Sequence, residues 1–426
     1  MSGARTFVRG FVGVGAVRLC SILLALVTSI VLARTLGVES FGKYAFVMAL
    51  VPLLSLPVAG GLAPLLTREI ATYCHNDNWP LFRGLLRASH AWVLTCSLVL
   101  LLLAWLYVDA DAAAGQGRLQ LVMIALLLVP LGGVNAIRSG VLKGMGMPVR
   151  AVLPVQIIQS TLFLLALSLI GLAYSLNVVT VLWVQVAAAL LAYLAGSWLL
   201  LRNRPAGVRH GPTSYETLRW SSSLLPFALL AAVGTFNSQI GILMLGMLGT
   251  DEQVGGLRVA DRAAHLVGLP LTLVNMVIAP YIVRARGDGD QQRLQRLAQR
   301  AARGSFAIAI TVAVPLVLFG SAVITFVFGD DFARPAYLPM VLLIAGYLVN
   351  VFFGSVGYLL SMSGFVRDSV KGQVASILVN VTLCALLVPV YGALGAAAGV
   401  ALGMLVRNVL LAMLVRRRLG IRPGVL

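Results

Sequence analysis

Acidic residues are scarce in this sequence. Asp and Glu number 14 against 32 Lys and Arg, and charged residues of both signs make up 11% of the 426 positions. A soluble chain would carry about a quarter charged residues. Hydrophobic residues reach 60%, and the mean hydropathy is +0.96. This composition excludes an ordinary soluble protein and indicates a chain that is largely solvated by lipid.

The residues that usually carry reaction chemistry are also few. There are four Cys and four His. Three of the cysteines, Cys20, Cys96 and Cys384, lie in apolar runs, so we expect no disulfide, and no spacing resembles a metal site. The sequence has no phosphate-binding Gly-x4-Gly-Lys-Ser/Thr loop, and no pair of carboxylates falls within the apolar runs. We therefore expect no enzyme activity, no cofactor, no metal and no direct use of ATP.

Long apolar runs recur along the whole chain. Runs of about 20 apolar residues are the signature of helices that span a bilayer. Twelve are predicted, near residues 11–33, 42–66, 88–108, 119–142, 149–172, 178–201, 220–247, 254–283, 304–328, 336–361, 370–389 and 392–415. We therefore predict an all-α polytopic membrane protein with twelve transmembrane helices.

The basic residues are distributed unevenly between the connections. With the N-terminus placed in the cytoplasm, 23 basic residues fall on the inward side, 4 in outward connections and 5 within the predicted spans. This is the pattern of the positive-inside rule. The formal charge of +18 is therefore attributed to orientation in the membrane and not to a nucleic-acid partner. Both termini are predicted to be cytoplasmic.

The first half of the sequence is echoed in the second. The segment "LGVESFGKYAF" at 36–46 and the segment "LGTDEQVGGLRVA" at 248–260 both run from Leu-Gly through acidic residues to a glycine, Gly42 or Gly255, that begins the next helix. Each of those helices then reaches an Ala-Pro-x-x-x-Arg segment. Because six spans separate the two copies, both halves enter the membrane in the same direction, as parallel repeats.

The boundary between the halves is predicted in a basic stretch rich in Gly and Pro. We expect an N-terminal six-helix lobe over 1–203, a cytoplasmic linker over 204–218 and a C-terminal six-helix lobe over 219–426. Substrate sites of transporters built from repeats lie at the repeat interface. The two lobes are therefore predicted to surround a central cavity.

Five arginines lie within the predicted spans: Arg18, Arg138, Arg258, Arg262 and Arg407. A charged side chain at the bilayer centre costs at least about 2.5 kcal/mol, so such residues usually face a water-filled cavity and carry function. Arg18 and Arg407 begin two turns inside their spans, which favours that interpretation. Arg138 is one turn from the end of its span, where extension of the side chain to the interface is an alternative.

One face of the segment 255–280 collects charge. Arg258, Arg262 and His265 are spaced i, i+4 and i+7, and Asp261 lies between them at i+3, so all four share a helix face. In one interpretation this face lines the interior. In the other, Asp261 neutralises an arginine and the cluster holds an outer helix interface together. Asp261 and His265 are the titratable pair within the spans suited to couple transport to an ion.

Neutral polar side chains lie in other spans at matching spacing. They are Gln156, Gln159 and Ser160, then Asn237, Ser238 and Gln239, then Gln373, Ser376 and Asn380. Hydrogen bonds between helices and sugar-binding amides in a hydrated cleft explain them equally. The sign of the charge is more informative, because arginine matches the oxygens of phosphate or pyrophosphate in a fork geometry. Several arginines with one aspartate favour an anionic substrate.

Two stretches also resemble a known family. "VLARTLGVESFGKYAFVMAL" (31–50) and "GGLAPLLTREIA" (60–71) look like the start of the bacterial polysaccharide flippases. These are the Wzx-type O-antigen and exopolysaccharide repeat-unit translocases of the multidrug/oligosaccharidyl-lipid/polysaccharide exporter superfamily. "LGTDEQVGGLRVADR" (248–262) is similar to the family's own repeat of the first run. The motifs are structural and are typical of the superfamily more than of one substrate.

The resemblance implies two six-helix lobes around a cationic cavity that opens alternately to either side. The substrate would be an undecaprenyl-pyrophosphate-linked oligosaccharide repeat unit, flipped across the bacterial cytoplasmic (inner) membrane. Related peptidoglycan lipid flippases typically have fourteen spans, two more than predicted here, so that substrate is disfavoured. Other membrane proteins of polysaccharide assembly are candidate partners at the inward loops.

The leading hypothesis is therefore a non-enzymatic flippase of lipid-linked oligosaccharides. Its candidate substrate-binding residues are Arg18, Arg138, Arg258, Arg262 and Arg407, and its candidate ion-coupling residues are Asp261 and His265. An ion-coupled multidrug antiporter of the same superfamily is the first alternative, but it would need carboxylates deep in the cavity. A membrane-embedded glycan ligase or polymerase is the second, and it would need large outward loops with catalytic acids or bases.

Overall fold

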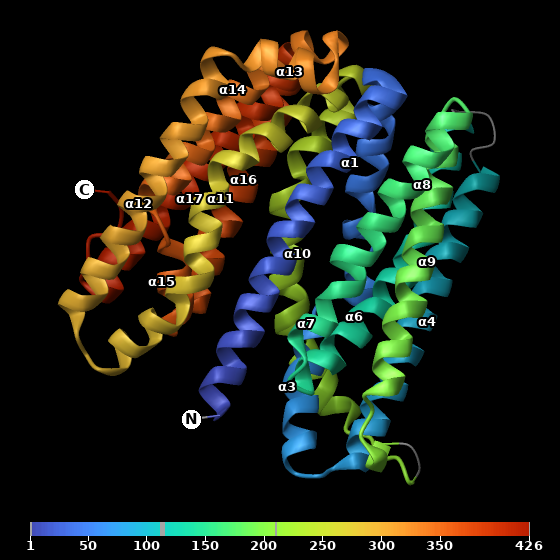
Figure 1. Cartoon of the computed structure of the whole chain (residues 1–426), viewed down its shortest axis with the longest axis vertical. Coiled ribbons are helices and arrows are strands. Elements are labelled where there is room, and N and C mark those ends of the chain that lie inside the picture. Colours follow the sequence, from blue (N-terminus) through green and yellow to red (C-terminus); the bar gives the residue numbers. More distant parts are fainter. Residues whose placement is uncertain (1, 111–115, 209–210, 426) are drawn as a thin grey trace. The chain divides into compact units, whose positions relative to one another are not determined.

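The computed structural model describes residues 2–110, 116–208 and 211–425 (Figure 1). Within these ranges the secondary structure is helical and contains no strand. The chain forms two compact units. The N-terminal unit holds the chain up to Thr35 and Val47–Thr235, and the C-terminal unit holds Leu36–Phe46 and the chain from Phe236 onward. The unit boundary therefore falls within two long helices, at 35/36 and 46/47 in the first and at 235/236 in the second. The lobe limits in the sequence stay a prediction.

The two units share helices α1 and α10, and α1 contains a kink at Gly37. The helices up to the second shared helix are α1 (Ser2–Leu54), α2 (Leu56–Ala59), α3 (Leu62–His75), α4 (Trp79–Ala110), α5 (Gln116–Leu126), α6 (Leu128–Gly144), α7 (Pro148–Leu153), the π-helix η1 (Pro154–Ile158), α8 (Gln159–Ala173), α9 (Val178–Arg202), the short 3-10 helix η2 (Ala206–Val208) and α10 (Thr217–Leu248). The remaining helices are α11 (Asp251–Gly287), α12 (Gln291–Leu318), α13 (Gly320–Phe328), α14 (Asp330–Phe353), α15 (Val356–Met362), α16 (Val366–Tyr391) and α17 (Ala393–Leu419).

Glycine and proline divide several of the spans. Gly37, with φ 73°, interrupts α1, and Gly354, with φ 70°, separates α14 from α15. Glycine adopts these left-handed conformations without the steric cost that a Cβ imposes. The break between α5 and α6 lies three residues before Pro130, where the Leu127 amide donates to the Ile124 carbonyl, 3.2 Å away. Proline removes a helical hydrogen bond, so a local break at this point is expected.

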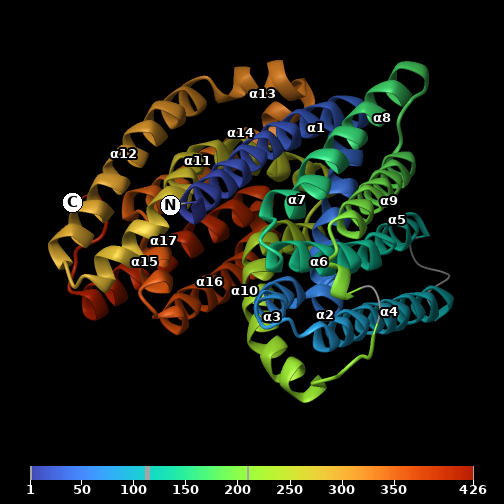
Figure 2. The same cartoon turned by 60° about the horizontal axis from the view of Figure 1, so that its bottom comes forward.

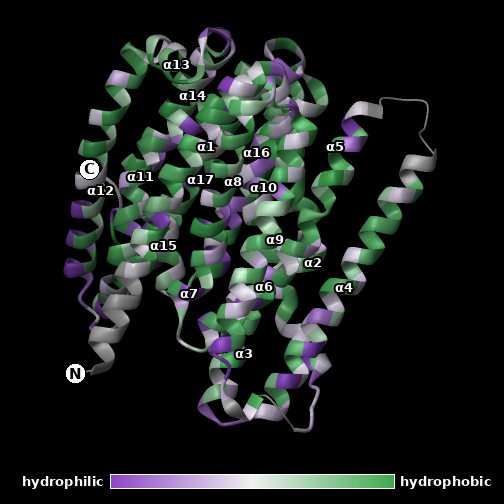
Figure 3. Cartoon of the chain, turned by 45° about the vertical axis from the view of Figure 1, so that its right-hand side comes forward, coloured by the Kyte–Doolittle hydropathy of each residue, from purple (hydrophilic) through white to green (hydrophobic). Residues whose placement is uncertain are grey.

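The predicted transmembrane character is confirmed. Among the described residues, ten helices are long and apolar enough to cross a membrane, or eleven if the α11 segments, bent by 48°, count as one span. The stretch Gly13–His75 has 63 residues, about 95 Å at helical rise. Because a bilayer is about 40–45 Å thick, this stretch supplies two crossings, which gives the twelve expected. Figure 3 shows the apolar residues along the helices and hydrophilic ones toward several of their ends.

Each unit has its own hydrophobic core. In the N-terminal unit α3 packs along α6, and α4 packs against both helices (Figure 2). Buried residues such as Leu66, Ile70 and Val141 belong to the core between these helices. Gly140 permits this approach, since a Cβ at that position would lie 2.7 Å from Leu66 Cβ. Small residues at contacts are the usual means by which membrane helices pack closely. In the C-terminal unit α14 lies against both α11 and α17, and this arrangement positions the site described next.

Candidate substrate site

Tyr347 links the two titratable residues predicted on α11. Its hydroxyl donates a hydrogen bond to Asp261 Oδ1, 3.4 Å away, and His265 Nδ1 lies 3.2 Å from the same hydroxyl. The His265 and Tyr347 rings meet edge to face, with centroids 5.6 Å apart. With Nδ1 protonated, His265 donates to the tyrosine oxygen while the tyrosine donates to the aspartate. Tyr347 lies on α14, so the relay joins two helices far apart in the sequence.

The two arginines on this face of α11 are half-buried and form no ion pair with a carboxylate of the described residues. Among the described residues Asp261 forms no ion pair, and its hydrogen-bond partner is Tyr347. The Nε atom of Arg262 is buried without a hydrogen-bond partner in that part of the chain. Tyr44, from the 36–46 segment, is close enough to interact electrostatically with both Arg258 and Arg262. Asp261 is also close enough to Arg258 to interact electrostatically, so it offsets part of that charge without forming an ion pair.

The polar groups continue to Arg407 on α17. Its Nη2 donates to Asn350 Oδ1 at 2.9 Å, and Asn408 Nδ2 donates to the same oxygen at 3.2 Å. Asn350 is three residues after Tyr347 on α14, so both side chains lie on one helix face. We call this group of residues the cationic seam: Arg258, Asp261, Arg262, His265, Tyr347, Asn350 and Arg407.

A cavity of about 260 Å³ adjoins the Arg407 end of the seam. Its polar lining consists of Asn275, Asn350, Ser355, Ser369, Gln373, Arg407 and Asn408. Ser355 donates a hydrogen bond to Asn275 across this cavity wall. The lining contains no carboxylate, so Arg407 is the charged group of the cavity. Asparagine and arginine side chains together offer several donors to an anion.

The structure separates the five predicted arginines into two groups. Arg258, Arg262 and Arg407 belong to the C-terminal unit, whereas Arg18 and Arg138 belong to the N-terminal unit. Arg18 is exposed on α1. Arg138 is 2% exposed, its three guanidinium nitrogens have no hydrogen-bond partner among the described residues, and it lies against Gly196 of α9. Arg138 therefore does not reach toward the interface as a snorkelling side chain would.

The neutral polar residues divide between two roles. Ser376 Oγ donates to Asn237 Oδ1 at 3.3 Å, which joins α16 to α10 within the C-terminal unit. Asn380 accepts a hydrogen bond from Cys384 Sγ at 3.1 Å on its own helix. The Ser376–Asn237 contact is a hydrogen bond between helices, as in the first interpretation, whereas the Asn380–Cys384 contact lies within one helix. Gln156, Gln159 and Gln373 instead line cavities.

Tyr347 and Asn350 were missed by the sequence analysis. A signal for them exists, because an aromatic hydroxyl and an amide spaced i, i+3 in an otherwise apolar span mark a polar helix face. Tyrosine is common in membrane helices near their ends, however, and neither residue carries a charge. Their role emerges from their partners on α11 and α17.

The fold is shared with a class of solved membrane transporters. A multidrug resistance MATE family transporter of the MOP superfamily, in its inward-facing conformation, superimposes with a TM-score of 0.75 at 17% identity, over 95% of this chain and 98% of that one. The lipid II flippase MurJ, in an inward closed conformation, superimposes with a TM-score of 0.75 at 12% identity, over 94% of this chain and 87% of that one. At these identities the likeness establishes the fold alone, which is that of the MOP superfamily.

The sequence places the chain within that class. It belongs to the polysaccharide biosynthesis protein family, whose model matches residues 7–286. The model of the lipid II flippase MurJ also matches residues 198–425. The resemblance found in the sequence is thereby confirmed at the level of the family, and the chain is a multi-pass membrane protein.

A curated relative agrees with this placement. The probable low-salt glycan biosynthesis flippase Agl15 of Haloferax volcanii is 23% identical over 200 residues. The match covers 46% of this chain and 42% of that protein. The chain therefore aligns with less than half of the relative's length, and the substrate of that protein is not transferred to this one by the match.

Proposed function

We propose that the chain flips undecaprenyl-pyrophosphate-linked oligosaccharide repeat units, of the O-antigen or exopolysaccharide kind, across the bacterial cytoplasmic membrane. Transport is by alternating access, with both termini in the cytoplasm. The observation that carries the proposal is the cationic seam, in which three arginines accompany one aspartate and the aspartate is hydrogen-bonded to Tyr347. Its excess positive charge suits an anionic headgroup. The family match and the flippases among the relatives support the same substrate class.

Pyrophosphate is the chemical complement of these arginines. Guanidinium groups donate two parallel hydrogen bonds to phosphate oxygens, and such charge-assisted bonds are roughly twice as strong as neutral ones. Arg262 has an unpartnered Nε atom, and Arg407 donates through Nη2 to a neutral amide. Both therefore retain donors for the anion. Two phosphates in the seam would offset the cost of holding several cations away from water.

The relay of Asp261, Tyr347 and His265 is the proposed coupling element. Histidine is the side chain whose ordinary pKa lies closest to neutral pH. Protonation of the imidazole adds a positive charge beside Arg262, and its loss removes that charge. The affinity of the seam for the anion then depends on the coupled proton. Arg18, which is exposed on α1, is the proposed substrate-binding cation of the N-terminal unit, whereas Arg138, 2% exposed against Gly196, is left out of the proposed set.

The test is deletion of the gene in its host, followed by extraction of the lipid-linked intermediates. We expect a complete, single repeat unit on prenyl pyrophosphate to accumulate, with loss of the surface polysaccharide. Complementation with the double variant Arg258→Ala, Arg262→Ala should fail at normal protein abundance. Arg417→Ala, an exposed arginine in the last turn of α17, is the matched control and should restore export.

Two outcomes would contradict the proposal. Normal export from the double variant would remove the role of the seam. Unchanged polysaccharide in the deletion strain, together with new sensitivity to cationic drugs, would favour the antiporter alternative, for which the shared MATE fold is the supporting observation.

A further inference from the structure

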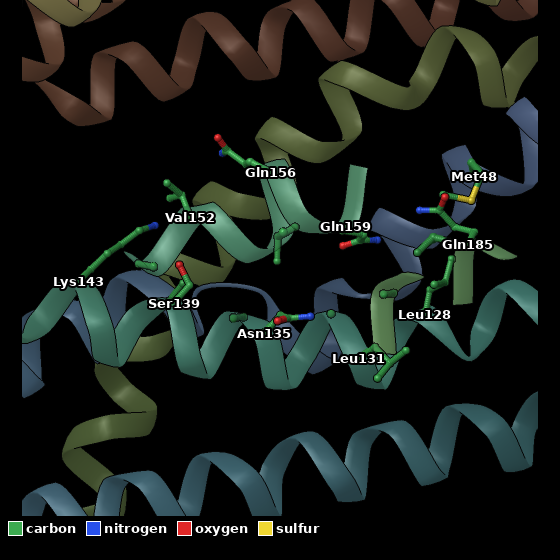
Figure 4. Close-up of a pocket in the computed structure, with 17 residues that line it drawn as sticks. Met48, Leu128, Leu131, Asn135, Ser139, Lys143, Val152, Gln156, Gln159 and Gln185 are labelled. Atoms are coloured by element: carbon green, nitrogen blue, oxygen red, sulfur yellow. The ribbon is translucent and has the colours of Figure 1, made fainter. Parts of the chain in front are cut away.

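The N-terminal unit contains a second polar cavity, separate from the cationic seam. Its volume is about 410 Å³, and it lies among α6, the α7–η1–α8 segment and α9 (Figure 4). Its polar lining consists of Asn135, Ser139, Lys143, Gln156, Gln159 and Gln185. The lining contains four amides, one amine and no carboxylate or guanidinium. We call this the amide pocket.

One wall of the amide pocket is a polar stripe on α6. Asn135, Ser139 and Lys143 are spaced i, i+4 and i+8, so they lie above one another on one helix face. Figure 4 shows Asn135 and Ser139 directed into the cavity and Lys143 at one end of it. Gly132 continues the lining one turn before Asn135 and leaves space because it has no side chain.

Buried amide oxygens in this pocket lack hydrogen-bond donors. Asn135 is 8% exposed, and its Oδ1 has no partner among the described residues. The Oε1 of Gln185, on α9, is likewise buried without a partner in that part of the chain. A buried acceptor without a donor is costly, and native structures contain few of them. The Oε1 of Gln156 is a third such oxygen in the pocket lining. Three buried acceptors without donors around one open cavity indicate that a ligand supplies the donors.

The opposite wall is shaped by a π-helical turn. The Gln159 amide donates to the Pro154 carbonyl, an i to i−5 hydrogen bond, which places one π-turn between α7 and α8. This turn lies where Gln156 and Gln159 both line the cavity. Single π-turns inside α-helices are rare and occur frequently at functional sites. The irregular turn, like the unpartnered oxygens, is therefore a feature that close packing alone does not require.

We propose that the amide pocket binds an uncharged sugar residue. The proposal rests on the proposed function and assigns this pocket to the neutral glycan part of the lipid-linked substrate. Sugar hydroxyls donate to amide oxygens and accept from amide NH2 groups, so one ring satisfies both kinds of group. The pocket volume falls within the range of about 300–1,000 Å³ typical of small-molecule sites.

The remaining lining fits the same ligand. Met48, Leu128 and Leu131 supply an apolar surface, which suits the C–H faces of a sugar ring. A pyrophosphate is disfavoured because the pocket has a single lysine, and a cationic drug is disfavoured because it has no carboxylate. The pocket and the seam thus differ in chemistry: the pocket is lined mainly by amides with one lysine, and the seam contains three arginines.

The test uses the purified full chain in lipid nanodiscs. The probe is the phosphate-free oligosaccharide released by mild acid from the host's own lipid-linked repeat unit, and binding is measured by calorimetry. The double variant Asn135→Leu, Gln185→Leu removes two of the three unpartnered acceptors of the pocket, those on α6 and α9, at similar side-chain volume. We expect its affinity for the probe to fall at least about tenfold, since each lost hydrogen bond to a neutral group is worth up to about that factor.

Two further variants make the result interpretable. Ser139→Trp fills the cavity without removing an amide, and it should weaken binding of the probe to a similar extent. Gln120→Leu, an exposed amide on α5 in the same unit, is the matched control and should bind the probe as the parent chain does. Thermal unfolding of each variant in nanodiscs shows that it is folded.

The outcomes separate this proposal from the flippase assignment. A parent chain that does not bind the probe, or pocket variants that bind it as well as the control, would overturn the amide pocket as a sugar site. Accumulation of lipid-linked repeat units in the deletion strain would stand unaffected by that result. Conversely, weakened binding in both pocket variants supports the sugar site whether or not the deletion strain accumulates the intermediate.

Discussion

Gly42 and Gly255, equivalent positions in the two sequence repeats, pack against each other within the C-terminal unit. A Cβ on Gly42 would overlap the Asp251 carbonyl oxygen and lie 3.0 Å from the Gly255 amide nitrogen, and a Cβ on Gly255 would overlap the Val38 carbonyl oxygen. The echo found in the sequence is therefore also a contact in space. The 36–46 segment belongs to the C-terminal unit because this contact holds it there.

Gly42→Ala is expected to destabilise the protein. The added methyl group meets backbone atoms on the facing helix, which cannot move as a side chain can, and such overpacking costs about 1–3 kcal/mol. The thermal unfolding midpoint in detergent, followed by size-exclusion chromatography of the fluorescently tagged chain, should fall. Gly304→Ala is the control, since nothing lies within 4 Å of a Cβ there. Equal unfolding midpoints for the two variants would show that the Gly42–Gly255 contact has room for a methyl group, which contradicts the prediction.

Tyr347→Phe is expected to impair export with little effect on folding. It removes the hydroxyl that joins His265 to Asp261 and leaves the ring in place. A hydrogen bond to a charged group is worth about 1.5–3 kcal/mol, so export should fall about tenfold or more. Surface polysaccharide and lipid-linked intermediates provide the measurement.

Tyr337→Phe is the matched control for the Tyr347 variant. Tyr337 lies on the same helix, α14, and its hydroxyl donates to the Val317 carbonyl, 3.0 Å away, outside the seam. Its loss should leave export unchanged. If both variants export alike, the relay of Asp261, Tyr347 and His265 has no part in transport.

Arg407→Met is expected to reduce export at least about tenfold, because it removes a fork-shaped donor of charge-assisted hydrogen bonds. Methionine matches the apolar stem of the arginine, and the variant should remain folded and abundant. Arg417→Met, at the exposed end of the same helix, should export normally. Full export from the Arg407 variant would show that Arg407 does not contact the substrate, and the proposed contacts of the seam would then be limited to Arg258 and Arg262 on α11.

Arg138→Met is expected to keep or raise thermal stability. The guanidinium is buried, and its nitrogens have no hydrogen-bond partner among the described residues. Replacing buried ionic groups with apolar side chains of similar volume is often neutral or stabilising by about 1–4 kcal/mol. The unfolding midpoint measures this directly. A marked fall in the midpoint would mean that Arg138 has a stabilising partner in the folded protein.

Composition and pattern were sufficient for the class of the protein and its span count. Lipid cannot satisfy backbone hydrogen bonds, so apolar runs of this length must be helices, and the structure has them. The breaks at Gly37 and Gly354 also follow from residue type, because glycine tolerates a positive φ. The unit boundary did not follow, since it depends on which surfaces α1 and α10 pack against.

The candidate site was predicted in part. The charged face of α11 was visible in the sequence because helical periodicity is local and places Arg258, Asp261, Arg262 and His265 together. Its partners were not visible. Tyr347 is more than 80 positions from Asp261, and no local pattern records a contact over that distance. Pairing of Asp261 with an arginine was one of two interpretations left open, and the hydrogen bond from Tyr347 on α14 to Asp261 depends on how α14 packs on α11.

The sequence by itself determined that this chain is a transmembrane protein, that its two halves carry an internal repeat, and that five arginines lie within its predicted spans, where charged residues are rare. These properties arise from transfer free energies and helical periodicity, which depend on each residue and its near neighbours. Only the tertiary structure decided that Arg407 joins the seam through Asn350, that Arg138 is buried within the N-terminal unit, and that Asn135 and Gln185 face one cavity. Those relationships depend on how side chains from distant helices interlock, and that packing is a property of the folded chain as a whole.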